Sequence, residues 1–225
     1  MTLDRLIGLA PTRRTLLLGG ILAWSSLVRA GDLEDFFDAV NRDDDRSVRR
    51  LLERGFDPNS IDAKGQTALG IAMRDECLRV AEVLMAHPSI RPDQANAHGE
   101  TPLMLAAIQG RRDWVERFLA RGGQLNRTGW TPLHYAASGP SPDIVKLLVD
   151  RGAILDAPSP NRSTPLMMAA GYGAIDAADL LLRLGANPTL RNDAGLTAAD
   201  FARRAGRDSL VERIESAVAS RRPTP

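Results

Sequence analysis

The sequence contains few aromatic residues, a single cysteine and almost no excess charge. Only 4% of its 225 residues are aromatic, so a hydrophobic core must be built mainly from Leu, Ala, Val and Ile. Cys77 is the only cysteine, which excludes an intramolecular disulfide. The formal net charge is +1, and this gives no electrostatic reason to expect nucleic acid or an anionic membrane surface as a partner.

The N-terminal apolar stretch is too short to be a permanent membrane anchor. Residues 15–28 carry no charge, whereas a spanning helix needs about twenty apolar residues. Arg5, Arg13 and Arg14 precede the stretch, and Val28-Arg29-Ala30 follows it with small residues three and one positions before a cut. This layout is typical of a secretory signal. We therefore predict a cleavable signal peptide over residues 1–30, with cleavage after Ala30 and no stable anchor afterwards.

The segment from Thr12 to Leu17 resembles the twin-arginine export signal of bacteria, with Arg13 and Arg14 as the arginine pair. The match is partial, because Leu16 stands where Phe is frequent and Leu18 replaces a frequent Lys. The general secretory route therefore stays open as an alternative. Either route predicts a periplasmic or secreted protein.

Beyond Asp32 the sequence repeats itself. Five threonines open similar segments at intervals of 34, 30, 33 and 33 residues, and a degenerate copy begins at Glu34. The five are Thr67, Thr101, Thr131, Thr164 and Thr197. A fixed period of this length indicates a stacked array of repeated units.

Each unit is predicted to fold as a helix, a turn, a second helix and a loop. The anchor threonine suits an N-cap, and a following proline suits the first helical position. Paired alanines such as Ala136-Ala137 allow helices to approach closely. Gly110, Gly173 and Gly206 permit a turn between the helices. The C-terminal caps of the second helices fall at Gly55, Gly122, Gly152 and Gly185.

These residues resemble the ankyrin repeat family. The resemblance rests on Thr131-Pro132-Leu133-His134, Gly129 and Gly152-Ala153, and it extends over about Leu33 to Ser216. It implies an all-α solenoid of about six helix-turn-helix units with projecting β-turn loops. We expect this domain over residues 31–218, followed by a disordered tail over residues 219–225. The resemblance also implies that the protein binds other proteins.

Several units depart from the repeat pattern. His87-Pro88 stands where Arg-Gly is usual, so that helix is expected to end irregularly. The connection before Thr131 is about three residues short, which predicts a truncated loop and a notch. Ser141 and Pro142 replace a glycine turn as a predicted cap and first helical position. Arg162 occupies a loop position where glycine is usual.

No residue pattern supports catalysis, a cofactor or a metal. His134 occupies the histidine position of the repeat, where a hydrogen bond between neighbouring units is expected. His87 and His98 match no zinc signature. Asp43-Asp44-Asp45 lacks the spacing of a calcium loop. The sequence contains neither a phosphate-binding loop nor a nucleophile elbow, so we predict a protein that is not an enzyme.

A repeat scaffold leaves the loop tips and the outward side of each first helix free for recognition. We predict that these regions form a concave protein-binding surface. Trp130 and Tyr172 are its strongest candidates, because aromatic residues are enriched at interface hot spots. Packing over the truncated loop is an equal alternative for Trp130, whereas Trp114 is expected in the core. The other candidates are Asp62, Lys64, Arg74, Asp75, His98, Gln109, Arg127, Arg191 and Asn192.

The favoured function is that of an exported, monomeric binding module for another protein. One alternative is an inhibitor or immunity protein that neutralises a periplasmic enzyme or toxin. Another is an oxidative-stress accessory protein that uses Cys77. A eukaryotic secreted origin is a further possibility, because Asn126-Arg127-Thr128 and Asn161-Arg162-Ser163 match the glycosylation pattern.

Overall fold

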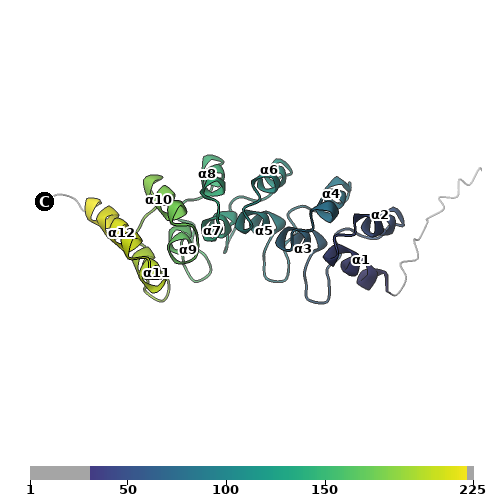
Figure 1. Cartoon of the computed structure of the whole chain (residues 1–225), viewed down its shortest axis with the longest axis horizontal. Coiled ribbons are helices and arrows are strands. Elements are labelled where there is room, and N and C mark those ends of the chain that lie inside the picture. The colour runs from purple at the N-terminus through teal and green to yellow at the C-terminus, as the bar shows by residue number, and fades with distance from the viewer. Residues whose placement is uncertain (1–30, 222–225) are drawn as a thin grey trace, which may run out of the picture.

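The computed structural model describes residues 31–221, and this part of the chain consists of six helix pairs joined by loops (Figure 1). The helices are α1 (Asp32–Asn41), α2 (Asp45–Glu53), α3 (Ala68–Arg74), α4 (Leu78–Ala86), α5 (Pro102–Ile108), α6 (Arg112–Ala120), α7 (Pro132–Ser138), α8 (Pro142–Asp150), α9 (Pro165–Gly171), α10 (Ile175–Arg183), α11 (Ala198–Arg204) and α12 (Asp208–Ser220). The predicted all-α repeat solenoid is confirmed.

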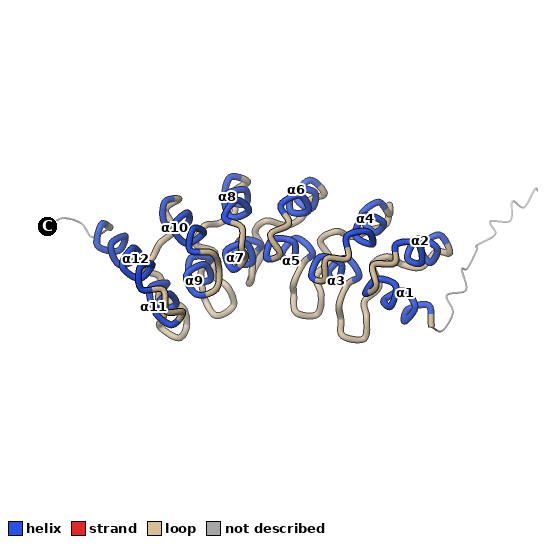
Figure 2. The backbone as a smooth tube through the Cα atoms, in the orientation of Figure 1, coloured by secondary structure: helices blue, strands red, loops and turns tan. Residues whose placement is uncertain are grey.

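The helices form two rows along an elongated stack. The odd-numbered helices make an inner row and the even-numbered helices an outer row, while the loops project beyond the inner row (Figure 2). Neighbouring inner helices contact each other more extensively than neighbouring outer helices do. The alanine pairs of α5, α7 and α9 are almost completely buried, because small side chains let the inner helices approach closely. This difference curves the stack toward the inner row.

The anchor threonines begin the inner helices as predicted. Thr67, Thr101, Thr131, Thr164 and Thr197 are the N-cap residues of α3, α5, α7, α9 and α11. The Thr67 hydroxyl accepts a hydrogen bond from the Gly70 amide at 3.1 Å. Ser141 is the N-cap residue of α8, but its side chain makes no capping hydrogen bond. The predicted position of that cap is therefore correct, while the predicted side-chain contact is absent.

Most outer helices end at a glycine with a left-handed backbone, and φ lies between 85° and 100° at the four predicted positions. Helix α4 differs as expected, because His87 continues in an extended conformation. Gly173 was predicted to allow a tight turn by its backbone freedom, and this reason is wrong, since its φ is not positive. A Cβ atom there would lie 1.8 Å from the Ala137 carbonyl oxygen. Gly173 is needed because the chain passes so close to α7.

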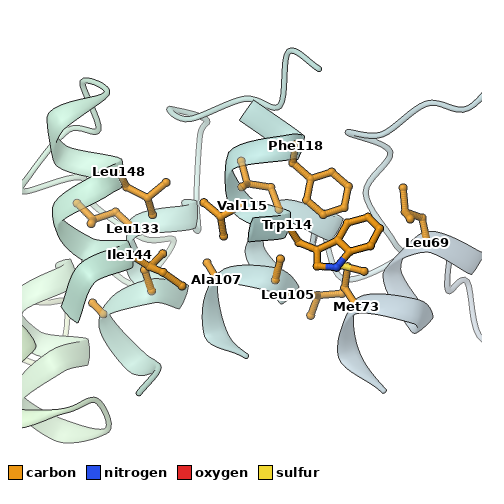
Figure 3. Packing of buried hydrophobic residues seen from close by; sticks show 14 of the residues in the cluster. Leu69, Met73, Leu105, Ala107, Trp114, Val115, Phe118, Leu133, Ile144 and Leu148 are labelled. Carbon is orange, nitrogen blue, oxygen red and sulfur yellow. The ribbon is translucent and has the colours of Figure 1, made fainter. Parts of the chain in front are cut away.

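The core runs continuously through the stack between the two rows. Trp114 of α6 is 2% exposed and lies beside Phe118, with a ring-centroid distance of 5.8 Å. Figure 3 shows its indole between Phe118 and Met73 of the preceding unit. The prediction that Trp114 belongs to the core is confirmed. In the first unit, the rings of Phe36 and Phe56 pack together with a centroid distance of 4.5 Å. Aromatic side chains therefore fill the core of this unit.

A ladder of side-chain hydrogen bonds connects successive loops. In each step an Asn or Asp side chain accepts from a backbone amide of the next unit. The pairs are Asn59 with Arg91 at 2.7 Å, Asp93 with Gln124 at 3.2 Å, Asn126 with Ile154 at 2.9 Å and Asp156 with Asn187 at 2.9 Å. Asn59, Asp93 and Asp156 lie eight residues before the next anchor threonine, whereas Asn126 lies five before Thr131. The three missing residues therefore belong to the segment between Asn126 and Thr131.

Two predictions concern the chain ends. Helix α12 continues to Ser220, two residues beyond the predicted end of the domain at residue 218. The predicted signal peptide, with Arg13, Arg14 and Ala30, lies outside the described residues, as does the end of the predicted tail. Among residues 31–221, no helix is long and apolar enough to cross a membrane.

Candidate protein-binding surface

The loop before each inner helix forms a tip that projects beyond the inner row. Four of these tips are closed by a backbone hydrogen bond of 2.9–3.0 Å across the turn. In each bond the amide of the first residue donates to the carbonyl of the second, and the pairs are Asp62 and Gln66, Asn96 and Glu100, Ser159 and Ser163, and Asn192 and Leu196. The fourth unit has no such bond among the described residues. Trp130 occupies the position that closes the turn elsewhere, so the deletion has opened this tip.

Hydrogen bonds couple the tips on either side of the fourth unit. The Ala97 amide donates to the Gly65 carbonyl at 2.9 Å, which joins the second and third units. The Asp193 amide donates to the Asn161 carbonyl at 3.0 Å, which joins the fifth and sixth. Pro160 stands at the corresponding position of the fifth unit and has no amide hydrogen to donate. The row of tips is thus interrupted at the fourth unit, where the sequence predicted a notch.

A mainly apolar groove of about 170 Å³ lies beside this interruption. Trp130 borders it from the loop, and Tyr135 and Ser138 contribute from α7. The groove is lined by Ile108, Trp130, His134, Tyr135, Ser138 and Met168. The half-buried Trp130 ring also meets His134 edge-on, with a centroid distance of 5.2 Å. The geometry is compatible with both sequence interpretations of Trp130, since the side chain packs against α7 and also borders the groove.

Sequence reasoning missed Ile108, Tyr135 and Met168. Tyr135 and Met168 lie four residues after an anchor threonine, and Ile108 lies seven after one. None of these three residues was among the predicted surface residues. Because three inner helices curve past one another here, these side chains meet at the inner surface. Bulky residues at these positions, close to a shortened loop, were the available signal.

Two polar side chains around the groove are held by hydrogen bonds. The Tyr135 hydroxyl donates to Glu100 Oε1 at 2.9 Å, while Glu100 Oε2 accepts from Asn96 at 2.8 Å. Burial, together with Glu100, raises the pKa of Tyr135 well above its ordinary range. Tyr135 therefore stays a neutral hydrogen-bond donor, and the Glu100 carboxylate is already bound on both oxygens.

His134 links two units, as the sequence predicted. Its Nε2 lies 3.0 Å from the Ser163 carbonyl oxygen, and its Nδ1 lies 3.2 Å from the Thr131 amide nitrogen. These partners assign the proton to Nε2, which donates to Ser163, while Nδ1 accepts from Thr131. Burial lowers the pKa of His134. The imidazole is therefore a neutral structural group.

Several of the predicted surface residues lie in the loop tips or at the ends of inner helices. Lys64, His98 and Arg191 are exposed in the tips, and Arg127 is half-buried. Tyr172 is 65% exposed at the end of α9, with Phe201 at a ring-centroid distance of 6.4 Å.

Three other predicted residues form a pair of linked contacts at the ends of α3 and α5. Arg74 binds Asp75 through two hydrogen bonds of 2.8 and 2.7 Å, and Gln109 donates to the Arg74 carbonyl at 2.9 Å. All three residues are exposed.

Asp62 and Asn192 have mainly structural roles. Asn192 is 8% exposed, its Oδ1 accepts from the Ala194 and Leu196 amides, and its Nδ2 donates to Ser163. Placing Asn192 on the binding surface was wrong, because it fastens its own tip to the preceding one. Asp62 accepts from two amides of its tip in the same manner.

Neither the cysteine nor the acidic residues form a reactive or metal site in the described part of the chain. Cys77 is 5% exposed at the start of α4, and burial raises the pKa of its thiol. Residues 31–221 contain no cluster of three or more His, Cys, Asp or Glu side chains that could hold a metal ion.

Comparison with known proteins identifies the repeated unit. A family model described as ankyrin repeats (3 copies) matches residues 36–128 and 112–192. Human ankyrin repeat and SOCS box protein 16 is 32% identical over 192 residues, which are 80% of this chain and 42% of that protein. The mouse B-cell lymphoma 3 protein homolog is 30% identical over 152 residues, 64% of this chain and 34% of that protein. The chain thus spans less than half the length of these curated relatives.

A solved structure has the same fold. It is a chain from the complex of a predatory endopeptidase from Bdellovibrio bacteriovorus with an immunity protein. The TM-score is 0.68 at 23% sequence identity, and the match covers 81% of this chain and 97% of that chain.

Proposed function

Because the chain belongs to the ankyrin repeat family, we propose that it binds a partner protein through its inner face, without catalysing a reaction, and that the groove beside Trp130 is the centre of the contact. The observation that supports this proposal is the coincidence of an apolar groove with an opened loop tip. The repeats on either side keep their tips closed, so a partner segment can reach the groove at the fourth unit.

The residues around the groove have properties suited to recognition. Trp130 borders the groove, and Tyr172 is exposed at the end of α9. Both provide large aromatic surfaces, which are enriched at the energetically important centres of interfaces. Helix α7, which contributes to the groove, is anchored in the stack by the buried Leu133 and His134. A preformed surface loses little conformational entropy on binding. The chain is expected to act as a monomer before it meets its partner.

Affinity capture from an extract of the native compartment tests this surface. The wild type is compared with Trp130→Ala, Tyr172→Ala and the double variant, while Lys146→Ala on outer helix α8 serves as the control. We expect the captured protein to be lost with the double variant and retained by the control. Identical profiles for all variants would remove the inner face as the binding surface.

An inhibitory or immunity role is the second candidate. It is motivated by the similarity in fold to a chain from an endopeptidase–immunity protein complex, a match that covers nearly all of that chain. If the partner is a hydrolase, adding the purified protein to the extract should lower a peptidase activity, and Trp130→Ala should restore it. A captured partner whose activity is unchanged in the complex would exclude this role.

We further propose export to the periplasm or beyond. Residues 1–30 carry the sequence pattern of a cleavable signal, and α1 begins at Asp32. Cleavage after Ala30 would therefore leave the helices of residues 31–221 intact. The fold consists of contacts within and between adjacent units, so it should form quickly. That behaviour suits a route that carries folded cargo, as the twin-arginine route does.

Redox protection by Cys77 and glycosylation of the loops receive less support. A role in redox protection requires an accessible thiolate, whereas the Cys77 thiol is buried and its pKa is raised. Equal oxidant sensitivity of Cys77→Ser and wild-type strains would dispose of that role.

Glycosylation at Asn126 would disrupt the ladder of hydrogen bonds between loops. The side-chain Nδ2 of Asn126 donates to the Gly152 carbonyl at 2.9 Å, and its Oδ1 accepts from the Ile154 amide.

A further inference from the structure

The loop tips of four consecutive units carry basic residues without acidic partners. Lys64, His98, Arg127 and Arg162 lie in the tips of the second to fifth units. None of their side chains forms an ion pair or a hydrogen bond among residues 31–221. In contrast, Arg74, Arg79 and Arg117 elsewhere in the stack are paired with carboxylates. The formal positive charges of Lys64, Arg127 and Arg162 therefore remain available to a partner.

Arg162 is held in this position at an energetic cost. Its φ is 61°, and the corresponding positions in the other tips are the glycines 65, 99, 129 and 195, with φ between 71° and 87°. A left-handed backbone is disfavoured for a residue with a Cβ atom, because the Cβ atom comes too close to the following carbonyl oxygen. Residues kept in such conformations are concentrated at functional sites. The exposed Arg162 side chain is thus a candidate for a function that glycine could not perform.

Arg127 and Arg162 border the interruption in the row of tips. Arg127 lies three residues before Trp130, and a Cβ atom added at Gly129 of the opened tip would lie 3.6 Å from the ring of Pro160, two residues before Arg162. Carboxylates also lie along the same row, where Asp62 and Asp156 accept from backbone amides. Glu100 is bound by Tyr135 and Asn96, Asp93 accepts from the Gln124 amide, and Asp193 lies in the sixth tip. Arg127 and Arg162, which form no ion pair among residues 31–221, thus lie in the fourth and fifth tips, whose Trp130 and Ser163 contact the groove-lining His134.

We infer that the partner presents a short acidic segment with one apolar side chain, which enters the groove beside Trp130 while its carboxylates bind Arg127 and Arg162. This inference rests on the proposed function and adds the chemistry of the partner. The groove of about 170 Å³ is large enough for one ring-sized group, since a cavity of roughly 150 Å³ accommodates benzene. Arginine can bind a carboxylate through two parallel hydrogen bonds, which favours an acidic segment over a neutral one.

Selection of random peptides displayed on phage tests the inference while the partner is still unidentified. The purified protein is the target, and the selected sequences are then measured as fluorescein-labelled peptides by anisotropy. We expect peptides that combine several Asp or Glu residues with one aromatic or aliphatic residue. Their affinity should fall about tenfold or more with Arg127→Glu/Arg162→Glu and with Trp130→Ala. Lys146→Glu, which reverses a charge on outer helix α8, should leave the affinity unchanged.

A second variant separates charge from folding. Arg162→Gly removes the charge and relieves the backbone strain, so it should fold at least as stably as the wild type and still weaken binding. Arg162→Lys should retain much of the binding. Circular dichroism and thermal melting verify that each variant is folded. Equal binding by Arg162→Gly would show that Arg162 has no part in recognition.

Each remaining outcome is decisive. Basic or neutral consensus peptides, failure to select any peptide, or binding that ignores the arginine reversals would overturn the inference. Equal affinity for a single-stranded oligonucleotide of matched charge would do the same, because the site would then recognise polyanions in general. If capture of the native partner is lost with Trp130→Ala but survives Arg127→Glu/Arg162→Glu, the proposed function stands and this inference fails. If the native partner is still captured by all the variants, both the proposed binding surface and this inference are wrong.

Discussion

Asp43 and Val80 belong to neighbouring units, and the Asp43 carboxylate accepts a hydrogen bond from the Val80 backbone amide at 2.9 Å. Val80 is the third residue of α4, whose own N-cap residue, Cys77, makes no side-chain capping bond. The same carboxylate accepts from Arg79 Nε at 2.9 Å. Each helix needs partners for its first amides. Here the preceding unit supplies one, so stacking completes the helix.

Asp43→Ala should lower the free energy of unfolding by about 1–2 kcal/mol, the usual cost of losing a helix cap. Asp43 has a left-handed backbone with φ of 51°, which adds strain for alanine. Asp43→Asn keeps an acceptor for Val80 and tolerates this backbone, so it should cost less. Urea unfolding of both variants provides the measurement. Equal destabilisation by Ala and Asn would refute the capping role.

The stability of the protein should decrease as the pH falls below about 6.5, the ordinary pKa of histidine. The folded-state pKa of His134 is lowered by burial, so the unfolded state takes up a proton first. Neutral His134 makes its full contribution to the free energy of unfolding above the unfolded-state pKa. As the pH falls from the unfolded-state pKa to the lower folded-state pKa, this contribution decreases by at most about 1.4 kcal/mol per pH unit. Urea midpoints between pH 7.5 and pH 5 would measure it.

The control for this pH dependence is His134→Gln, which cannot titrate. Its stability should be lower than that of the wild type at pH 7.5 but nearly constant through this range. Hydrogen bonding to Ser47 lowers the pKa of Asp44 and hydrogen bonding to Thr197 lowers that of Asp200, so both carboxylates lose their contribution only below pH 4. An unchanged slope in His134→Gln would assign the effect to another group.

Trp114→Ala should destabilise the protein by about 3–5 kcal/mol, because it empties a fully packed position in the middle of the stack. The Arg117 guanidinium lies 4.0 Å from the Trp114 ring centroid and also binds Glu82, so the variant would loosen a link between α6 and α4. Trp114→Phe should cost less than half as much. A loss below 1 kcal/mol for the alanine variant would contradict this description of the core.

Arg162→Gly should raise the free energy of unfolding by about 0.5–1 kcal/mol, since relief of the left-handed strain exceeds the added entropy of the unfolded chain. Gly129→Ala places a Cβ atom on a backbone with φ of 87° and should destabilise by a similar amount. Thermal melting of the two variants gives a matched comparison. A destabilised Arg162→Gly would mean that the arginine side chain supports the fold.

Replacement of Arg13 and Arg14 by lysine should leave the protein in the cytoplasm if export uses the twin-arginine route. Fractionation followed by immunoblotting of the producing bacteria measures the distribution, and mass spectrometry of the exported form checks cleavage after Ala30. Unchanged export of the lysine variant would assign the protein to the general secretory route instead.

The sequence was sufficient to predict the fold because each unit carries its own local signals. Threonine caps, the prolines that follow them and the C-terminal glycines act within a few residues, and their recurrence predicted six helix pairs. Trp114 could be assigned to the core for the same reason, since it occupies a position of the second helix that is apolar in other units. The prediction failed at Gly173, where the need for glycine comes from the nearby Ala137 carbonyl of another unit.

The sequence by itself determined the repeated helices, the shortened loop before Thr131 and the unusual arginine at position 162. Only the tertiary structure decided which side chains meet around the groove. Ile108, Tyr135 and Met168 belong to three different units, and their proximity depends on how closely the inner helices stack. The structure likewise showed that Asn192 is buried and that Arg162 forms no ion pair with another residue of the range 31–221. Helix caps and turns depend on residues that are close in the sequence, whereas a binding surface depends on distances between residues of different units.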